Sequence, residues 1–208
     1  MLPRYRLLLI AFSLALMAAC STDEPRVESD KSSVKSSVVA DKSSVAYDFT
    51  KRATVLGWSV QNDTVMGGVS ESSNTWVEKQ MVFSGNLSLE NNGGFVSSFG
   101  PVDEKLSSLM NGATSIRVRA TGDGNTYLLQ LRSDSGTNYI QRFTTTPEED
   151  ELYVLPLSDF TAVDWRLSEI PDAPALETNN IDQMGFYLVD KQAGPFRIAI
   201  SSIGVSTK

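Results

Sequence analysis

The sequence predicts an all-β fold, a jelly-roll β-sandwich, for residues 47–208 of the 208-residue chain. Short runs of apolar and β-branched residues follow one another through this part, and Gly, Asn, Asp or Ser separates each run from the next. Almost none of these runs repeats with the period of a helix. Many short strands at regular spacing, without intervening helices, are typical of β-sandwiches and barrels.

The first 19 residues have the organisation of an export signal. Arg4 and Arg6 lie in an acid-free start, and the run of 13 apolar or small residues at 7–19 follows them. A charged segment before a short apolar run is typical of a signal peptide. Because a membrane-spanning helix needs roughly 20 apolar residues, a permanent anchor is the weaker interpretation.

The only cysteine of the chain, Cys20, directly follows this run in the sequence Met17-Ala-Ala-Cys. This motif resembles the lipobox of bacterial lipoproteins, which implies that Cys20 becomes the lipidated first residue of the mature chain. Multiple acyl chains would then tether the protein stably to a membrane. We expect a lipid-anchored protein of the bacterial cell envelope, and Ser21 implies the outer membrane in a Gram-negative cell. The alternative is an ordinary signal peptide followed by a chance cysteine.

Residues 20–46 read as a spacer between the lipid and the domain. They lack aromatic residues, Gly, Leu and Ile, and they repeat Lys-Ser-Ser-Val three times. A segment with so little to bury cannot offset the entropy of ordering its backbone. We therefore expect a disordered linker up to residue 46 and one folded domain from Tyr47 onward.

The centre of the domain carries its clearest strand patterns. Residues 114–120 alternate, with Ile116 on one face and Arg117 on the other, and the turn 122–125 follows. In the next run Tyr127, Leu129 and Leu131 share a face, and a turn at 134–136 leads to a third run at 137–144. Alternation of this kind predicts half-buried strands, here forming a three-stranded meander.

Further strands are expected on both sides of this meander. Only residues 103–111 indicate a short helix, and Pro171 and Pro174 mark a loop before the last two strands. The additional strands are predicted at 54–60, 76–89 with a break near Gly85, 95–99, 151–157, 183–189 and 196–205.

The composition excludes several classes of chemistry. With no His and one Cys, the chain cannot form a Ser-His-Asp triad, a histidine-ligated zinc site or an internal disulfide. Its formal charge of −7 argues against nucleic-acid binding through the overall field. Neither a phosphate-cradling glycine loop nor a dinucleotide fingerprint occurs, so we expect no nucleotide cofactor.

Two long segments of the domain read Trp58-Ser-Val-Gln-Asn-Asp-Thr-Val-Met-Gly-Gly-Val-Ser-Glu-Ser and Phe83-Ser-Gly-Asn-Leu-Ser-Leu-Glu-Asn-Asn-Gly-Gly-Phe-Val-Ser. They resemble the complex I intermediate-associated protein 30 family, and segments 170–176 and 190–198 also look like its C-terminal half. The resemblance implies a galactose-binding-like β-sandwich, and the family's mitochondrial members assist the assembly of respiratory complex I. The stretch 163–166 departs from the pattern that bacterial relatives often have.

The glycine pairs in these two segments suggest a binding rim. Such loops could expose backbone amides and polar side chains to sugar hydroxyls, and an indole could stack on a sugar ring. The alternatives are turn geometry for the glycines and a core position for the tryptophan. The candidate ligand-binding residues here are Trp58, Asn62, Asp63, Asn91 and Asn92.

A second group of candidates comes from the polar face of the meander. Gln130 and Arg132 project from one strand and Arg142 from its neighbour, so an arginine there could bind a carboxylate or phosphate. Cross-strand pairing with acids is the structural alternative. The turns at Asp123 and Asp134 lack the ligand spacing of a calcium loop. We therefore predict no cofactor or metal, with a structural calcium as the alternative.

These features together predict a non-catalytic, membrane-anchored envelope lipoprotein whose β-sandwich binds a partner. A protein partner, in assembly of a complex, is the first hypothesis, because the resembled family is known for assembly. A carbohydrate-binding module is the second. A hydrolase is the third, since two carboxylates suffice for a glycosidase but only the fold can place them.

Overall fold

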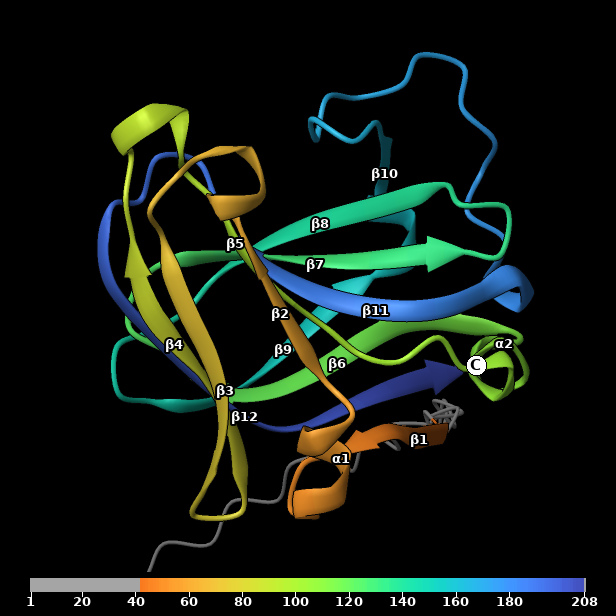
Figure 1. Cartoon of the computed structure of the whole chain (residues 1–208). Coiled ribbons are helices and arrows are strands. Elements are labelled where there is room, and N and C mark those ends of the chain that lie inside the picture. Colours follow the sequence, from red (N-terminus) through yellow and green to blue (C-terminus); the bar gives the residue numbers. More distant parts are fainter. Residues whose placement is uncertain (1–41, 208) are drawn as a thin grey trace, which may run out of the picture. The chain divides into compact units, whose positions relative to one another are not determined.

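The computed structural model describes residues 42–207, so the predicted signal peptide, Cys20 and residues 20–41 of the predicted spacer lie outside the described residues. Two six-stranded antiparallel sheets lie face to face (Figure 1). Sheet A has the order β3 (Glu71–Val77), β4 (Gln80–Leu87), β12 (Gly194–Thr207), β6 (Ala113–Thr121) and β9 (Asp150–Pro156), with β1 (Lys42–Asp48) also paired to β12. Sheet B has the order β10 (Thr161–Val163), β8 (Asn138–Thr144), β7 (Thr126–Ser133), β11 (Ile181–Leu188), β5 (Val96–Phe99) and β2 (Ser59–Asn62).

Helices are few and short in the described part of the chain. The α-helices are α1 (Arg52–Leu56) and α2 (Glu104–Met110), and the 3-10 helices are η1 (Asp63–Met66), η2 (Glu90–Asn92), η3 (Leu157–Asp159) and η4 (Thr178–Asn180). The Asp103 side chain caps α2 by accepting a hydrogen bond from the Lys105 amide, as the predicted helix at 103–111 requires. Within residues 42–207, no helix has the length and apolar content needed to cross a bilayer.

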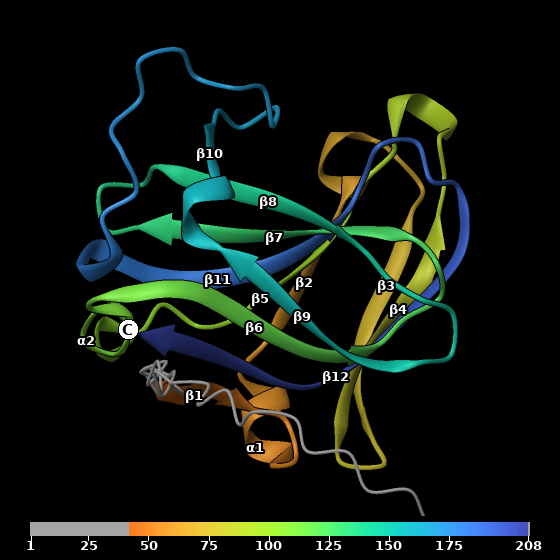
Figure 2. The same ribbon diagram turned by 180° about the vertical axis from the view of Figure 1, so that it is seen from behind.

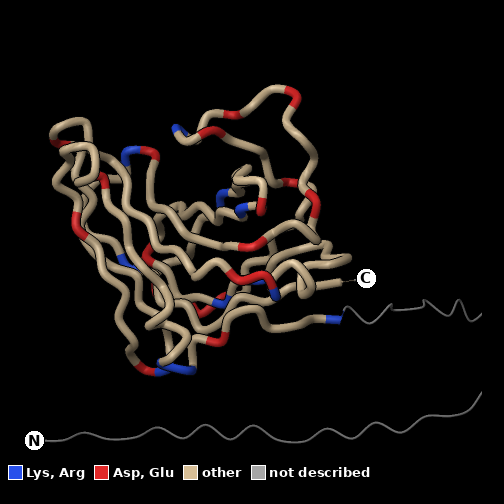
Figure 3. Tube along the Cα trace, turned by 45° about the vertical axis from the view of Figure 1, so that its right-hand side comes forward, with Lys and Arg blue, Asp and Glu red and all other residues tan. Residues whose placement is uncertain are grey.

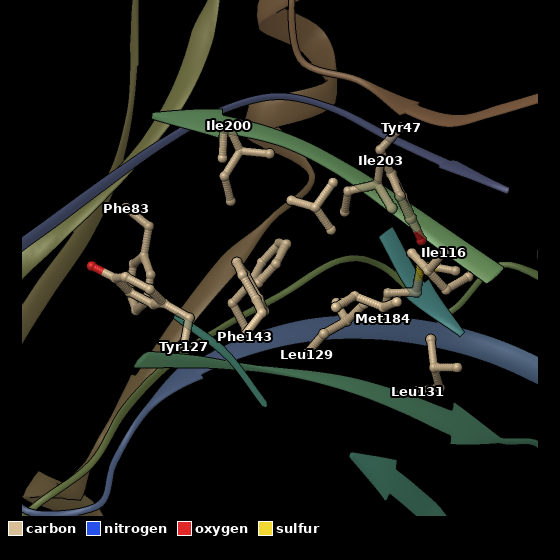
Figure 4. Packing of buried hydrophobic residues seen from close by; sticks show 14 of the residues in the cluster. Tyr47, Phe83, Ile116, Tyr127, Leu129, Leu131, Phe143, Met184, Ile200 and Ile203 are labelled. Atoms are coloured by element: carbon tan, nitrogen blue, oxygen red, sulfur yellow. The ribbon is translucent and has the colours of Figure 1, made fainter. Parts of the chain in front are cut away.

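The core lies between the two sheets and is built from alternating strand positions. Ile116 of β6 points into it, as do Tyr127 and Leu129 of β7, while Arg117 and Arg119 point away. Figure 4 shows these apolar side chains meeting between the layers. Burial of one face per strand explains the period of two in the sequence. The predicted all-β sandwich is thus confirmed, as is the prediction of which side chains of β6 and β7 point into the core.

The predicted meander is wrong in one respect. β7 and β8 form the expected hairpin, but β6 pairs with β9 and β12 in sheet A. The turn at 122–125 therefore crosses from one sheet to the other, as the view from behind also shows (Figure 2). The period of two identifies a strand but not its sheet, because both sheets bury one face in the same core.

The start of the domain also differs from the prediction. Residues 42–46 were expected in the disordered spacer, and this is wrong, because they begin β1 and pair with the end of β12 from Lys42 opposite Thr207. The pairing uses backbone groups, which a polar Lys-Ser-Ser-Val segment supplies as well as an apolar one does. Side-chain composition therefore gave no sign of this strand.

Two further expectations on either side of η1 are corrected. Residues 54–60 form the end of α1 and the start of β2, rather than one strand. The strand at 76–89 breaks at Glu78 and Lys79, which form the β3–β4 turn with φ of 50° and 63°, and Gly85 lies inside β4. A Cβ on Gly85 would lie 1.9 Å from the carbonyl oxygen of Glu71, so a glycine is needed here to let β4 approach β3 closely.

Candidate binding cleft

The register of sheet B places side chains from five strands in one row on its outer face. Arg142 of β8 lies opposite Leu128 of β7, and Leu128 lies opposite Tyr187 of β11. Tyr187 in turn pairs with Ser97 of β5, and Ser97 pairs with Gln61 of β2. Directly paired residues project to the same side of a sheet. Of this row, Arg142, Tyr187 and Gln61 line the floor of a cleft, which thus has polar groups at both ends and an aromatic ring near its middle, while Leu128 and Ser97 are buried.

Loops raise walls around this floor and enclose a cleft of about 600 Å³. One side is built from η1, the turn after η2 and the β11–β12 turn, which lie side by side in both ribbon views (Figures 1 and 2). The loop after β10 supplies the opposite side. The residues that line the cleft are Gln61, Val65, Met66, Asn92, Gly93, Gly94, Phe95, Arg142, Trp165, Arg166, Leu167, Tyr187, Val189, Asp190 and Lys191.

The first wall is held together by the buried carboxylate of Asp63. Its Oδ1 accepts a hydrogen bond from the Ser70 amide at 3.0 Å, and its Oδ2 accepts from the Gly94 amide at 2.7 Å and from the Ser70 hydroxyl. Burial alone would raise the pKa of Asp63, but the bonds from Ser70, Gly94 and Phe95 outweigh it and hold the pKa below its ordinary value. An ionised Asp63 thus joins two loops about 30 residues apart in the chain.

The glycine pairs of the sequence enclose this carboxylate. A Cβ on Gly68 would lie 2.3 Å from the Oδ1 of Asp63, and one on Gly93 would lie 2.6 Å from its Oδ2. Side chains at these positions would displace the carboxylate from its amide donors. Gly67 has a φ of 90° and ends η1 in the left-handed region. The glycines are therefore explained by the packing around Asp63 and by turn geometry.

The β11–β12 turn carries two charged residues at the cleft. Asp190 accepts two hydrogen bonds from the Arg142 guanidinium, 2.7 Å from Nε and 3.1 Å from Nη2, which raises the pKa of Arg142. Asp190 and Lys191 both have φ near 60°, which costs about 1–2 kcal/mol per residue outside glycine. The Gln192 side chain fixes the turn to β7, because it accepts from the Thr126 amide and donates to the Thr126 carbonyl oxygen, both at 2.8 Å.

The opposite wall is a tight turn closed by Asp164. Its Oδ1 accepts from the amides of Arg166 and Ser168 at 2.8 and 2.9 Å, so the Asp164 side chain fixes the backbone of the turn. Leu167 is partly buried and packs against the small apolar cluster that includes Leu128 and Val189. Trp165 is 73% exposed, and the Arg166 guanidinium lies 4.5 Å from the centre of its ring. The turn therefore presents an indole to the cleft on a fixed backbone.

Three predicted site residues are buried and cannot meet a ligand directly. Trp58 is 6% exposed and packs edge-on against Tyr47 and Phe49, so the core interpretation of this residue is correct. Asp63 is fully buried in the loop junction just described, and Gln130 is 5% exposed. Asp63 was expected to contact the ligand, but it instead holds the two loops of the cleft wall together from beneath.

The other predicted residues lie at or near the cleft. Asn92 and Arg142 line it, which brings one member of each candidate group together. Asn91 is exposed beside Asn92, and both adopt left-handed backbone angles. Asn62 accepts a hydrogen bond from the Ser72 hydroxyl. Arg132 does not line the cleft. Burial raises the pKa of Tyr187 to about 12, and the positive charge of Arg132 opposes this rise.

Sequence reasoning missed the aromatic part of the cleft. Trp165 carried a signal, since it stands in a polar segment between Asp164 and Arg166 where an apolar strand position is not expected. Tyr187 alternates with Met184, Phe186 and Leu188, which places it on the face away from the core. Only the pairing of β11 with β5 and β7 shows that this face is the cleft floor.

Acidic side chains are few at the cleft. Asp190 is the only carboxylate among its lining residues, and it is paired with Arg142. In the described part of the chain, no group of three or more acidic, His or Cys side chains could hold a metal. The carboxylate of Asp123 instead accepts from the Asn125 amide, the Tyr127 hydroxyl and the Arg197 amide, so it organises the sheet-crossing turn.

The folded domain matches a known protein family. The model of the complex I intermediate-associated protein 30 family matches residues 47–200. The chain belongs to this family. Complex I intermediate-associated protein 30, mitochondrial, from Mus musculus is 26% identical over 197 residues, which cover 82% of this chain. The match covers 58% of the mouse protein, so the chain spans less than two thirds of that relative's length.

Solved structures resemble this family member in fold. The family 11 carbohydrate-binding module of a Clostridium thermocellum cellulase has a TM-score of 0.56 at 16% identity, covering 80% of this chain and 95% of that one. The same module in complex with a mixed-linked tetrasaccharide has a TM-score of 0.57 at 16% identity, covering 78% and 94%. An agarase matches at 0.53 and 12% identity, over 80% of this chain and 24% of its own. The shared fold is the galactose-binding-like jelly roll.

Proposed function

We propose that this domain is a non-catalytic binding module that holds a saccharide in the cleft on the outer face of sheet B. The observation that carries the proposal is Trp165, an exposed indole on a fixed wall that faces a floor with Tyr187 and Gln61. Sugars are bound by aromatic rings, which contact their C–H faces, together with polar groups that pair with their hydroxyls. The cleft contains both kinds of group.

The dimensions and rigidity of the cleft support the same function. A volume of about 600 Å³ lies in the range of roughly 300–1,000 Å³ common for small-ligand sites. Its walls are fixed by Asp63, Asp164 and Gln192, so little ordering is needed when a ligand binds. The similarity to a carbohydrate-binding module solved with a tetrasaccharide agrees with this proposal.

The absence of catalysis is part of the proposal. A glycosidase needs two carboxylates flanking the scissile bond. Among the described residues that line the cleft, Asp190 is the single carboxylate, and its two oxygens are occupied by Arg142. Hydrolysis of saccharides by the purified protein, abolished by Asp190→Asn, would contradict this part of the proposal.

The first test is thermal unfolding of the purified protein against a panel of neutral and acidic oligosaccharides. A ligand that binds only the native state at 100 times its Kd stabilises it by about 2.7 kcal/mol, which raises the Tm by several degrees. We expect such a rise for at least one saccharide, and none with monosaccharides that are too small to reach both walls. A panel without any shift would contradict saccharide binding.

A protein partner is the second candidate, because the family takes its name from a protein associated with an assembly intermediate. Val65 and Met66 are exposed apolar residues on the η1 wall, as a protein-binding surface would require. Cross-linking that captures a defined protein at this wall, together with an unresponsive saccharide panel, would favour this candidate.

We also propose that the domain is tethered to the cell envelope by lipid on Cys20. The support is the apolar run followed by Met17-Ala-Ala-Cys at the only cysteine. In cells, the protein is expected to incorporate labelled palmitate and to sediment with membranes, whereas Cys20→Ala loses both properties. Ser21→Ala is the matched control and keeps both. A Cys20→Ala protein that still sediments with membranes would overturn the proposal.

A further inference from the structure

The charge of the cleft is opposite to that of the chain. Arg142, Arg166 and Lys191 line it with a single acid, Asp190, so the lining carries a formal charge of +2. The whole chain carries −7, and Figure 3 shows acidic and basic residues interspersed along the described trace. A positive cleft in an acidic protein needs an explanation, since random placement of these residues would favour the opposite sign.

Two of the three cations are not neutralised by the protein. Arg142 is paired with Asp190 by two hydrogen bonds. In residues 42–207, neither Arg166 nor Lys191 forms an ion pair with an acid, and Arg166 lies over the ring of Trp165 instead. They stand on opposite sides of the cleft, one in the turn after β10 and the other in the β11–β12 turn. A ligand between the walls would meet both charges.

Both cations are carried by turns with a fixed backbone. Lys191 precedes Gln192, whose side chain is hydrogen-bonded to Thr126 of β7. The backbone amide of Arg166 itself donates to the Asp164 carboxylate, as does the amide of Ser168. Fixed charges within a cleft focus the field on a ligand more strongly than charges on an open surface. A guanidinium that stacks on an indole also keeps its N–H groups free for an anion.

The geometry points to an acidic saccharide as the ligand of the cleft. Carboxylate or sulfate groups on the sugar are held by Arg166 and Lys191, while the sugar ring contacts Trp165 and Tyr187. This inference rests on the saccharide-binding function proposed above and adds the class of sugar. The acid group can be a uronate carboxylate or a sulfate ester, because both present oxygen anions to these cations.

Matched pairs of oligosaccharides test the inference by isothermal titration calorimetry with the purified protein. A galacturonate tetramer is compared with its methyl ester, and a sulfated galactan tetramer with its unsulfated form. We expect one acidic member to bind at least about tenfold more tightly than its neutral partner, and salt to remove most of this difference. The arm that responds identifies the acid group.

Three variants and one control assign the effect to the cleft. Arg166→Gln and Lys191→Gln should each weaken the acidic ligand about fivefold, with little change for the neutral partner. Asp190→Asn keeps an oxygen for Arg142 and removes the only acid, so it should strengthen acidic binding. Lys105→Gln, an exposed cation of α2 outside the cleft, should change neither affinity.

The possible outcomes distinguish a failure of the acidic preference from a failure of saccharide binding itself. Equal affinity for the acidic and neutral members, or no gain with Asp190→Asn, would overturn the acidic preference and leave a neutral saccharide module. No binding by any member of the pairs would count against both the acidic preference and saccharide binding.

Discussion

Replacing Asp63 by Asn should destabilise the protein by about 3 kcal/mol, because the amide cannot accept all the hydrogen bonds that the carboxylate accepts. An asparagine at this buried position also turns an N–H group toward the amides of Ser70 or Gly94, which are donors themselves. Urea unfolding at neutral pH measures the loss. The junction between η1 and the turn after η2 should loosen with it, so saccharide affinity should fall as well.

The effect of Asp63→Asn should depend on pH in a defined direction. The pKa of Asp63 is lowered by folding, so its contribution is fully present above the ordinary value of about 3.9 and is lost as the pH falls through the lower folded value. The stability difference between the wild type and the variant should therefore stay constant near neutral pH and shrink below about pH 4.

Asp172→Asn is the control for this prediction, since Asp172 is exposed. It should change the free energy of unfolding by less than about 0.5 kcal/mol. An Asp63→Asn protein as stable as this control, or a difference that grows in acid, would show that the buried carboxylate does not tie the two loops together.

Replacing Trp165 by Ala should reduce saccharide affinity at least about tenfold, corresponding to about 1.4 kcal/mol or more. The indole is the exposed aromatic ring on the wall that follows β10, and its removal leaves that wall with Arg166 and Leu167 but no aromatic ring. Because Trp165 is 73% exposed, the Tm should change by only a few degrees. Titration calorimetry and thermal unfolding of the same preparation separate binding from stability.

Leu56→Ala is the matched control for Trp165→Ala. Leu56 is 75% exposed, belongs to α1 and does not line the cleft. Its replacement should leave saccharide affinity unchanged, and Trp165→Phe should give an intermediate affinity, since part of the ring surface remains. If Trp165→Ala binds the saccharide as tightly as Leu56→Ala does, the ligand does not use this wall.

Some features that depend on neighbouring residues in the chain were predicted correctly. The alternation in β6 and β7 correctly assigned Ile116 and Leu129 to the core and Arg117 to the outside. The sheet of each strand was not predictable in this way, and the turn around Asp123 joins two sheets rather than two neighbours. Pairing partners are chosen by tertiary packing, which a local period does not encode.

For the candidate site, too, the sequence identified some of the important residues but not their roles. The glycine pairs and Asp63 were identified as important, but a sequence does not distinguish a carboxylate that meets a ligand from one that is buried under the loops. Only the structure shows Gly68 and Gly93 closed around that carboxylate. Conversely, Trp58 was a candidate for stacking on a sugar, with a core position as the alternative, and the structure places it in the core, whereas Trp165 was not among the candidates.

The sequence by itself therefore determined the all-β class, the faces of the central strands and, through the absence of His, the exclusion of several catalytic mechanisms. The tertiary structure decided the position and charge of the cleft. Trp165, Tyr187 and Lys191 belong to different elements, and they meet because the register of β8, β7, β11, β5 and β2 aligns one row of side chains beneath four loops. That alignment is a sum of long-range pairings, whereas strand alternation follows from the geometry of each residue and its neighbours.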